Sequence, residues 1–589
     1  MRAARGNDRA GERQGKRVDS ARFLARGSRL TAHGSPVPVF GLRGGFVTLC
    51  RLLPSLSLAA MPNSRKRSPF TRAAGVGHAY PKGRSAVVAA AFALAFVALL
   101  LRAFWVQCVD YGFYQWQGDL RQMRDFQIHA MRGRLLDRDG HPLALSLPTR
   151  TLWIDSSDVG DVPSRKASAV ASLLGLDAAH VRALFDAHRP FAYLKRQVSD
   201  AVAQRAMRLD VPGLYMARDY RRFYPEGGIA AHVTGFAGVD GVGQEGMERV
   251  ENRLLTGVDG NRRVLRDAHG RVIDTVSLVK AKAGKDVRLS IDQAIQYEAF
   301  KAVREAVQGS GARAGSAIVL DAHTGEILAL ANWPTYDPNR RSARHGDGVR
   351  DRAVTDVFEP GSVLKPFTIA LALEHGVVEP GSIVPTDGGR LRLDGAVIHD
   401  DKNFGTLTVS QVIQKSSNVG TTKIALLLTP RDMWTNFRAV GLGRPPVAGL
   451  PGAAAGNLRA YAHWRRIEQA TMSYGYGLSA SLLQLAQAYT TFANDGVFVP
   501  ASIRPVGPAP IHGRRVYRTH VAREVRAMLA TVVSDDGTAP EATVPGYTAA
   551  GKTGTAYRWT PRGYDHSAYR ASFVGMVPAD APRVVIAVS

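Results

Sequence analysis

The sequence predicts a multidomain α+β protein that is attached to a membrane by one N-terminal helix. Three observations predict this class. The chain has 589 residues, which is too long for one ordinary domain and suggests about three or four units. One apolar segment near the N-terminus is long enough to cross a bilayer. The remainder mixes short β-type runs with helical stretches.

The first 84 residues are strongly basic. They contain 17 Lys or Arg and three acidic residues, and so account for +14 of the net charge of +26. Such a block is a nucleic-acid arm, a disordered tail or a cytoplasmic leader. Because an apolar segment follows directly, we expect 1–84 to be a basic cytoplasmic segment with little order, and we expect no nucleic-acid partner. Met61 is an alternative start to Met1.

Residues 85–106 form the apolar segment, SAVVAAAFALAFVALLLRAFWV. A helix of this length spans about 33 Å, enough to cross the hydrocarbon core. Basic residues stand immediately before it and acidic residues follow it, so the positive-inside rule places the N-terminus in the cytoplasm and the rest outside. A cleaved signal peptide is the alternative. The run is long for one and no small-x-small cleavage site follows, so we expect an uncleaved membrane helix.

Residues 107–290 predict an irregular, strand-rich α+β module. The runs RTLWID, FAYLKRQV and DVRLSID are typical of strands, and SRKASAVASLLGL is typical of a short helix.

Residues 291–589 predict an α/β domain whose sheet is built from both ends of the segment. A β-hairpin is expected over 314–332, and helices dominate from Pro366 to about Asp495. Strands return in TAAGKTGTAYR, ASFVGMVP and PRVVIAVS. The final run stops within an expected strand.

The segment FEPGSVLKPF places Ser362 and Lys365 three residues apart at the start of an apolar helix. A plain helix start explains Pro360 and Gly361, with the serine as a cap. The alternative is a nucleophile and its base on one helix face, since an amine beside a hydroxyl can accept its proton when burial lowers the amine pKa. Alone, this tetrapeptide is a weak signal.

Two further motifs decide between these interpretations. KSSN contains Ser416 and Asn418, and KTGT contains the run Lys552 to Thr555. Each alone has a structural explanation, a helix cap for the first and a hairpin turn for the second. SxxK, Ser-x-Asn and KTG in this order are the signature of penicillin-binding proteins and class A β-lactamases.

Other segments widen this resemblance to about residues 85–589. They are RGRLLDRDGHPLA, RRFYPEGGIAAHVTGFAGVDGVGQEGMERV, NWPTYDPN, RAVTDVFEPGS and YGYGLSASLLQLAQAYTTFANDG. The chain resembles the class B penicillin-binding proteins. KSSN, where elongation-type relatives usually carry Ser-x-Asp, resembles the septal, division-specific type (penicillin-binding protein 3 type).

The resemblance implies serine-type D,D-transpeptidation on stem peptides ending in D-Ala-D-Ala, a carboxypeptidase-like acyl transfer in which β-lactams are covalent inhibitors. It implies the following residue roles: Ser362 as nucleophile, Lys365 as base, Ser416 as proton shuttle, Asn418 holding the substrate amide and Lys365, Lys552 with Thr553, Gly554 and Thr555 binding the substrate carboxylate strand, and the backbone N–H groups of Ser362 and Thr555 as the oxyanion hole. A neutral Lys365 is expected from burial and from crowding by Lys552.

The same resemblance implies the architecture. It comprises a pedestal of the dimerisation-domain type and a C-terminal transpeptidase/β-lactamase-like α/β domain with a mostly antiparallel sheet and a helical subdomain. Relatives continue beyond the last strand of this sequence, so this domain is expected to be truncated at its C-terminus. The location implied is the inner membrane at the division site, with a septal glycan polymerase and other division proteins as partners.

No cofactor and no metal are expected. The sequence has two cysteines and lacks HExxH, paired CxxC and GxxxxGK[ST] motifs. Two functional alternatives stay open, a serine β-lactamase and a catalytically impaired scaffold or β-lactam sensor. No ExxLN segment that could activate water for a β-lactamase lies between Asn418 and Lys552. Glu359 is expected to be a solvated or helix-terminal carboxylate rather than a base.

Overall fold

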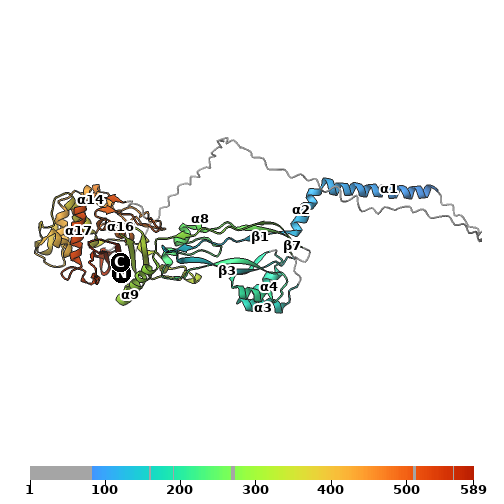
Figure 1. The fold of residues 1–589 in the computed structure, drawn as a ribbon, viewed down its shortest axis with the longest axis horizontal. Helices are drawn as coiled ribbons and strands as arrows, with labels where there is room; N and C mark the ends of the chain where they lie inside the picture. The colour runs from blue at the N-terminus through green and yellow to red at the C-terminus, as the bar shows by residue number, and fades with distance from the viewer. Residues whose placement is uncertain (1–81, 158–160, 190, 267–271, 508–512, 561–562) are drawn as a thin grey trace, which may run out of the picture. The chain divides into compact units, whose positions relative to one another are not determined.

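The computed structural model describes residues 82–589 apart from 158–160, 190, 267–271, 508–512 and 561–562 (Figure 1). The basic segment predicted for 1–84 lies outside the described residues up to position 81. The chain divides after Leu101 into two units.

An N-terminal helix, α1 (Lys82–Phe104), continues into a π-helical turn over Trp105–Val109. The helical stretch Gly83–Val109 is long and apolar enough to cross a membrane. Its large apolar side chains are exposed, as they would be in a helix that faces lipid. One N-terminal apolar helix was predicted, and it begins three residues earlier than the segment 85–106.

The first part of the second unit is rich in strands, as predicted. Its strands are β1 (Met123–Ile128), β2 (Leu135–Leu136), β3 (Pro142–Ile154), β4 (Ala192–Val198), β5 (Leu214–Phe223), β6 (Gly260–Arg266), β7 (Val272–Val279) and β8 (Val287–Arg288). One sheet has the order β4-β3-β2-β8 with β5 also paired to β3, and another has the order β1-β6-β7.

The helices of this part are short. They are α2 (Tyr111–Gln122), α3 (Ser164–Leu174), α4 (Ala178–Asp186), α5 (Asp200–Met207), α6 (Ala231–Thr234), α7 (Gly246–Val250) and α8 (Asn252–Leu255). Helices α3, α4 and α5 bury their apolar faces together with residues of β3, β4 and β5 in a separate small core. This core does not include residues of the larger C-terminal region.

The C-terminal region is built on a five-stranded antiparallel sheet in the order β10-β9-β21-β20-β19. These strands are β9 (Gly315–Asp321), β10 (Ile327–Trp333), β19 (Ala550–Thr560), β20 (Gly563–Val577) and β21 (Val584–Val588). The predicted hairpin is β9 and β10, and the predicted return of strands from the C-terminal part is β19 to β21. β21 lies between β9 and β20, and β19 forms one edge.

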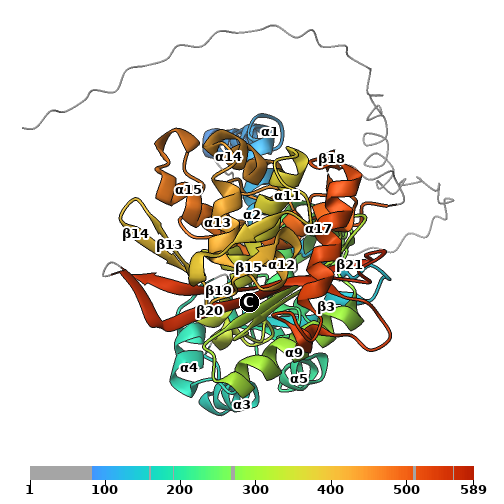
Figure 2. The same cartoon turned by 90° about the vertical axis from the view of Figure 1, so that its left-hand side faces the viewer.

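Helices cover both faces of this sheet. α9 (Gln293–Ser310) packs on β9 and β10, whereas α16 (Leu482–Ala493) packs against β21 and α17 (Thr519–Val532) packs against β19. Figure 2 shows α9 and α17 on opposite sides of the sheet. The other helices are α10 (Arg352–Thr355), α11 (Lys365–Glu374), α12 (Val409–Gln414), α13 (Asn418–Ala425), α14 (Pro430–Ala439) and α15 (Arg466–Ser473). Every residue of α16 is buried, including Gln484, Gln487, Thr490 and Thr491, and its other residues are apolar or aromatic.

Short two-stranded ribbons complete the helical part. They pair β11 (Val357–Phe358) with β16 (Ala480–Ser481), β12 (Ile383–Pro385) with β15 (Thr406–Thr408), β13 (Arg390–Leu393) with β14 (Ala396–His399), and β17 (Val497–Phe498) with β18 (Arg514–Arg515). The predicted helical subdomain is therefore present, with small hairpins between its helices.

A buried ion-pair cluster lies where the strand-rich part meets the C-terminal region. Glu248, which is 0% exposed, accepts hydrogen bonds of 2.6 Å from the Nε atoms of both Arg132 and Arg222. Arg132 also donates to the carbonyl oxygens of Gly241 and Glu248, each at 2.7 Å. Two cations share one carboxylate here, and the additional acceptors satisfy the remaining donors of Arg132, which buried charges require.

Candidate active site

The nucleophile turn is a single turn of 3₁₀-helix, η4 (Gly361–Leu364), that leads directly into α11. The backbone N–H of Lys365 donates to the carbonyl of Ser362. In a 3₁₀-helix the side chains at i and i+3 eclipse, so this geometry stacks Ser362 and Lys365 on one face. Pro366 lies in the first turn of α11, where its missing N–H costs little.

Gly361 and Gly554 allow this turn to approach strand β19 closely. Gly361 has φ +59°, and a Cβ on it would lie 2.8 Å from the carbonyl oxygen of Thr555. A Cβ on Gly554 would lie 2.8 Å from the carbonyl oxygen of Pro360 and 2.9 Å from Val363. Gly554 was predicted to belong to the strand that binds the substrate. The structure gives it a further role, contact with the nucleophile turn.

Helix α16 packs against the nucleophile turn. The Tyr489 hydroxyl donates to the carbonyl of Val363 at 2.7 Å, and the ring of Phe367 packs on Tyr489 and Phe492 with centroid distances of 5.3 and 4.9 Å. All three aromatic side chains are fully buried. The nucleophile turn is therefore fixed by rigid core packing, which catalytic side chains need.

Lys365 joins the first motif to the second. Its Nζ donates to the Ser416 hydroxyl at 3.1 Å and also to the Ser416 carbonyl. The lysine is 0% exposed, and burial lowers its pKa to about 7, while Asp400 and Asp401 oppose that shift. A neutral amine is therefore accessible at physiological pH, as a base in acyl transfer requires.

Ser416 occupies the turn between α12 and α13 in a left-handed backbone conformation, with φ 60°. Such a conformation is uncommon outside glycine and marks positions that the surrounding structure holds in place. The following Ser417 is the N-cap of α13, accepting from the N–H of Gly420 at 2.8 Å. The helix cap considered as the alternative interpretation of this motif is therefore present. It is formed by Ser417, the residue after the Ser416 that contacts Lys365.

Asp400 is a site residue that the sequence analysis missed. Its carboxylate accepts from the Ser417 hydroxyl at 2.7 Å and from the N–H groups of Asn418 at 2.5 Å and Val419 at 2.9 Å. A carboxylate at the N-terminus of α13 also complements the helix dipole. No motif signals this role, because Asp400 follows the β13–β14 hairpin and its partners lie 17 to 19 residues later.

The Asn418 side chain points toward that hairpin. Its Nδ2 donates to the carbonyl of His399 at 2.8 Å. Among the described residues, the hydrogen bonds of Lys365 go to Ser416, and none joins Lys365 to Asn418. This hydrogen bond to β14 fixes the Asn418 side chain beside the Lys365–Ser416 pair.

Lys552, Thr553, Gly554 and Thr555 lie within β19, on the edge of the five-stranded sheet. The motif is therefore a strand and not a hairpin turn. Lys552 is 0% exposed, and burial together with the charge of Lys365 lowers its pKa well below the usual value. Lys552 was predicted to lower the pKa of Lys365, but the effect of one lysine on the other is seen in the pKa of Lys552. Its Nζ donates to the carbonyl and the hydroxyl of Thr553, at 3.2 and 3.3 Å.

Thr553 and Thr555 face the same region from β19. The Thr553 hydroxyl is 2.9 Å from that of Thr538, and Thr555 is exposed, with its carbonyl accepting from Tyr476 at 3.4 Å. Because β19 is an edge strand, an extended peptide can add to it by main-chain hydrogen bonds, with Lys552 as the cation for a terminal carboxylate.

Glu359 is not the solvated carboxylate that was expected. Its Oε1 accepts from the N–H of Gly477 at 2.7 Å and from the hydroxyl of Tyr564 at 3.0 Å, and burial raises its pKa. Both partners come from segments that flank the nucleophile turn. The residue therefore ties this turn to β20, a contact that no pattern in the sequence signals.

A group with metal-ligand spacing, Asp137, Asp139 and His141, lies in the β2–β3 turn and not at this site. The Asp137 carboxylate already accepts from the N–H groups of Asp139 at 2.9 Å and His141 at 2.7 Å, and contacts the His141 ring at 3.1 Å. These bonds account for the cluster as a tight turn.

An antiparallel sheet with a serine–lysine turn packed on its edge strand, facing two further polar motifs, defines the class of serine acyltransferases that react with penicillin. Residues 315–589 match the family model of the penicillin binding protein transpeptidase domain. Residues 127–289 match the family model of the penicillin-binding protein dimerisation domain.

Similar proteins agree with this class. The chain is 40% identical over 512 residues to the probable peptidoglycan D,D-transpeptidase PenA of Neisseria gonorrhoeae, covering 86% of this chain and 88% of that protein. It is 38% identical over 511 residues to the peptidoglycan D,D-transpeptidase FtsI of Escherichia coli, covering 86% of each. The crystal structure of penicillin-binding protein 3 from Mycobacterium tuberculosis with aztreonam matches with a TM-score of 0.60 and 32% identity, covering 79% of this chain and 90% of that one.

The chain belongs to the class B penicillin-binding proteins of the penicillin-binding protein 3 type. It is a serine-type peptidoglycan D,D-transpeptidase, and its fold, with dimerisation and transpeptidase domains and one N-terminal apolar helix, is the one predicted.

Proposed function

We propose that this protein cross-links peptidoglycan stem peptides through an acyl-enzyme on Ser362, with Lys365 as the base. The observation that carries the proposal is the buried Lys365, whose pKa of about 7 leaves it able to accept the Ser362 proton. It follows Ser362 by three residues at the end of the 3₁₀ turn, which favours the same helix face, and it is hydrogen-bonded to Ser416 at 3.1 Å.

In the first half-reaction, the Ser362 oxygen attacks the penultimate carbonyl of a stem ending in D-Ala-D-Ala, and its proton passes to Lys365. The backbone N–H groups of Ser362 and Thr555 stabilise the oxyanion, a contribution of about 2.7–4 kcal/mol per donor in a comparable site. The C–N bond then breaks, and Ser416 passes the proton from Lys365 to the departing D-Ala amine.

The substrate lies along the edge of β19 in this proposal. Lys552, with the hydroxyls of Thr553 and Thr555, binds the terminal carboxylate, which supplies the counter-ion that this buried lysine lacks among the described residues. Asn418 holds the substrate amide. In the second half-reaction, the amine of a neighbouring stem attacks the ester and Ser362 is regenerated. Attack by water instead would give a carboxypeptidase product.

The proposed division of labour follows the predicted boundaries. Residues 85–106 anchor the chain in the inner membrane, 107–290 form a non-catalytic pedestal, and 291–589 carry out the reaction. The N-terminus is cytoplasmic and the catalytic region periplasmic, at the division site, where a septal glycan polymerase and other division proteins are the partners. Its relative FtsI and the apolar helix support this location. A fluorescent fusion that is spread evenly around the cell would contradict it.

The test of the catalytic proposal is the intact mass of the full chain after exposure to penicillin. We expect a gain of one drug molecule that persists for many minutes, is absent in Ser362→Ala, and forms more slowly in Ser416→Ala, which keeps the nucleophile. A rapidly lost adduct with hydrolysed drug would indicate a β-lactamase. A folded protein that forms no adduct would indicate a scaffold or an impaired enzyme.

A further inference from the structure

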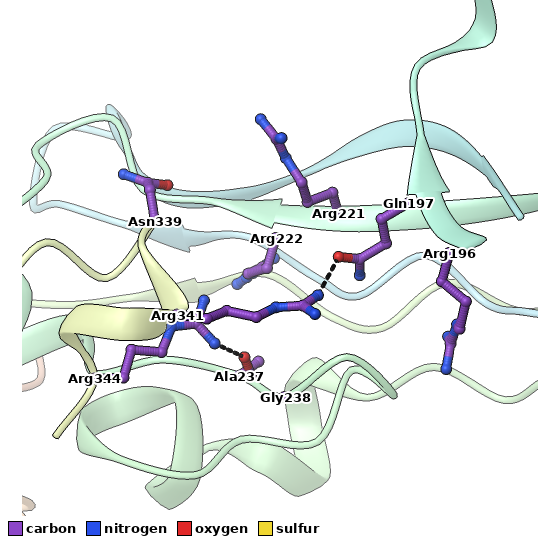
Figure 3. Close-up of a pocket in the computed structure, with 9 residues that line it drawn as sticks. All are labelled: Arg196, Gln197, Arg221, Arg222, Ala237, Gly238, Asn339, Arg341 and Arg344. Atoms are coloured by element: carbon purple, nitrogen blue, oxygen red, sulfur yellow. Dashed lines mark hydrogen bonds between the residues drawn. The ribbon is translucent and has the colours of Figure 1, made fainter. Parts of the chain in front are cut away.

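A strongly basic pocket of about 350 Å³ has no catalytic-motif residue in its lining. Figure 3 shows the residues that line it. It is formed by the ends of strands β4 and β5, the loop after α6, and the segment 339–344. Its lining comprises Arg196, Gln197, Arg221, Arg222, Ala237, Gly238, Asn339, Arg341 and Arg344. Five of these nine residues are arginines, and none is acidic.

Carboxylates neutralise only part of this charge. Arg196 pairs with Asp219 at 3.3 Å and with Asp240 at 2.5 Å. Arg222 pairs with Glu248, and the same carboxylate also pairs with Arg132. Arg132 does not line the pocket. The remaining three arginines (Arg221, Arg341 and Arg344) form no ion pair within the described part of the chain. A concave surface with unpaired charges of one sign concentrates ions of the opposite sign.

Arg222 offers the pocket a buried donor without a partner. Its side chain is 5% exposed, Nε donates to Glu248 at 2.6 Å, and Nη1 donates to Ser146 at 3.2 Å. Its Nη2 is buried and has no hydrogen-bond partner among the described residues. Leaving such a donor unsatisfied is unfavourable, and a ligand acceptor would remove that penalty.

Two other arginines are held in place by neutral acceptors. Arg341 donates to the side-chain oxygen of Gln197 at 2.7 Å (Figure 3). Gln197 has φ 56°, and its own amide donates to the carbonyl of Tyr220 at 3.0 Å. These bonds orient the Arg341 guanidinium without offsetting its charge.

Arg344 is fixed in the same way. It donates to the carbonyls of Pro338 and Ala237, each at 2.9 Å, and its guanidinium lies 4.9 Å from the centre of the Phe236 ring. Burial lowers the pKa of Arg344, and the nearby charge of Arg341 adds to that effect. The pocket thus holds repelling cations in preset positions, and an anion between them would relieve the repulsion.

We propose that this pocket binds a small polyanion, a ligand that carries at least two phosphate or carboxylate groups. Guanidinium groups bind both kinds of group with paired hydrogen bonds. The unpaired donors come from β5 on one side and from residues 341–344 on the other, so one ligand engages them together through two acidic groups. The volume is within the range of small-molecule sites.

A purely structural role explains fewer of the contacts. It accounts for the ion pairs Arg196–Asp219 and Arg222–Glu248 inside the strand-rich part. It also accounts for the hydrogen bonds from residues 341 and 344 that hold the segment 339–344 against that part. It does not account for arginines without carboxylates, or for the unsatisfied Nη2 of Arg222. A ligand that bridges β5 and residues 341–344 would also stabilise their contact.

The test is calorimetric titration of the full chain in an uncharged detergent at about 0.15 M salt, with inorganic pyrophosphate and with citrate as probes. We expect saturable binding of at least one probe, weakened at least tenfold by Arg341→Gln. The matched control is Arg340→Gln, one residue away, whose side chain is 79% exposed and absent from the pocket. It should weaken binding less than twofold. Penicillin acylation, expected to be unchanged in both variants, reports that each is folded.

Preference for pyrophosphate would identify a phosphate-bearing ligand, and preference for citrate a carboxylate-bearing one. Saturation by neither probe would overturn the proposal, as would equal weakening by the two substitutions, which would indicate diffuse surface charge. If Arg341→Gln is not acylated, Gln197→Leu carries the test, because it removes the anchor of Arg341 and leaves every charge in place. It should weaken binding about threefold.

Discussion

Two clusters of buried cations lie in this molecule, and they are neutralised in opposite ways. At the junction, Arg132 and Arg222 surround the fully buried Glu248 with short hydrogen bonds. At the active site, Lys365 and Lys552 are equally buried, and no carboxylate among the described residues forms an ion pair with either. Because arginine stays protonated, its cluster must contain an anion. Lysine can lose its proton instead, so the buried Lys365 can act as a base, whereas in the proposed mechanism the substrate carboxylate supplies the counter-ion of Lys552.

The largest effect on this comparison is expected from Lys365→Met, which keeps the length of the side chain and removes the amine. Loss of a general base costs about 10²–10⁴-fold in rate. We expect penicillin acylation of the full chain, followed by mass spectrometry over time, to slow by about 10³-fold or more. Its thermal midpoint should not fall, since a buried ionisable group is replaced by an apolar one. Lys423→Met, at an ion pair with Asp387, is the control for a lysine outside the site and should leave the rate unchanged.

At the junction, Glu248→Gln leaves two buried arginines facing a neutral amide. Removing one partner of a buried ion pair costs about 3–5 kcal/mol. Urea unfolding should show a loss of this size, whereas the exposed Glu245→Gln should change stability by less than about 0.5 kcal/mol. A loss of under 1 kcal/mol for Glu248→Gln would mean that the anion is dispensable, and the contrast between the clusters would fail.

Asp400→Asn tests the support of the second motif. The substitution removes the charge that accepts two backbone N–H groups and the Ser417 hydroxyl. We expect a stability loss of about 1–3 kcal/mol and slower acylation. Because Asp400 raises the pKa of Lys365, the pH midpoint of acylation should also fall. Asp401→Asn is the control, since Asp401 also raises that pKa but accepts none of those three hydrogen bonds. Asp401→Asn should lower the pH midpoint of acylation without the loss of stability expected for Asp400→Asn.

The pH profile of the wild-type enzyme sharpens the comparison further. With a pKa of about 7, Lys365 is mostly neutral above pH 7 and mostly protonated below it. The acylation rate should therefore rise with pH, with a midpoint near 7, and fall about tenfold for each unit below that. Stopped-flow measurement with a chromogenic β-lactam would give this profile. A rate independent of pH between 5.5 and 8 would remove Lys365 from the role of base.

The smallest effect is expected from Glu359→Gln. An amide oxygen can still accept from Gly477 and Tyr564, so the link between the nucleophile turn and β20 should remain. We expect acylation to change by less than about threefold at pH 8. Glu359→Ala, which removes both bonds, should be slower. A loss of 10²-fold or more in Glu359→Gln would instead make this carboxylate a participant in the chemistry.

The sequence predicted those parts of the fold and site that depend on local patterns. The apolar helix, the hairpin of β9 and β10, and the residue types of the three motifs are encoded in short segments. The contacts of Asp400 and Glu359 were not predictable, because each brings together residues that are remote in sequence, such as Glu359 and Tyr564. The arginine pocket was missed for the same reason. Its members come from four separate segments, and the charge of each looks ordinary in its own segment.

The position of β21 within the sheet has a consequence for biosynthesis. This strand lies between β9 and β20, although it follows β9 by about 260 residues in the chain. The pair β9 and β10 therefore cannot join the other strands of the sheet until Val584–Val588 has been synthesised. β19 joins the sheet only by pairing with β20, which pairs with β21. Pairing between such distant segments is slow, and it comes late in a chain that emerges from its N-terminus. Until these C-terminal strands have formed, the turn that carries Ser362 lacks the strand against which it packs, so we expect reactivity to appear only late in folding.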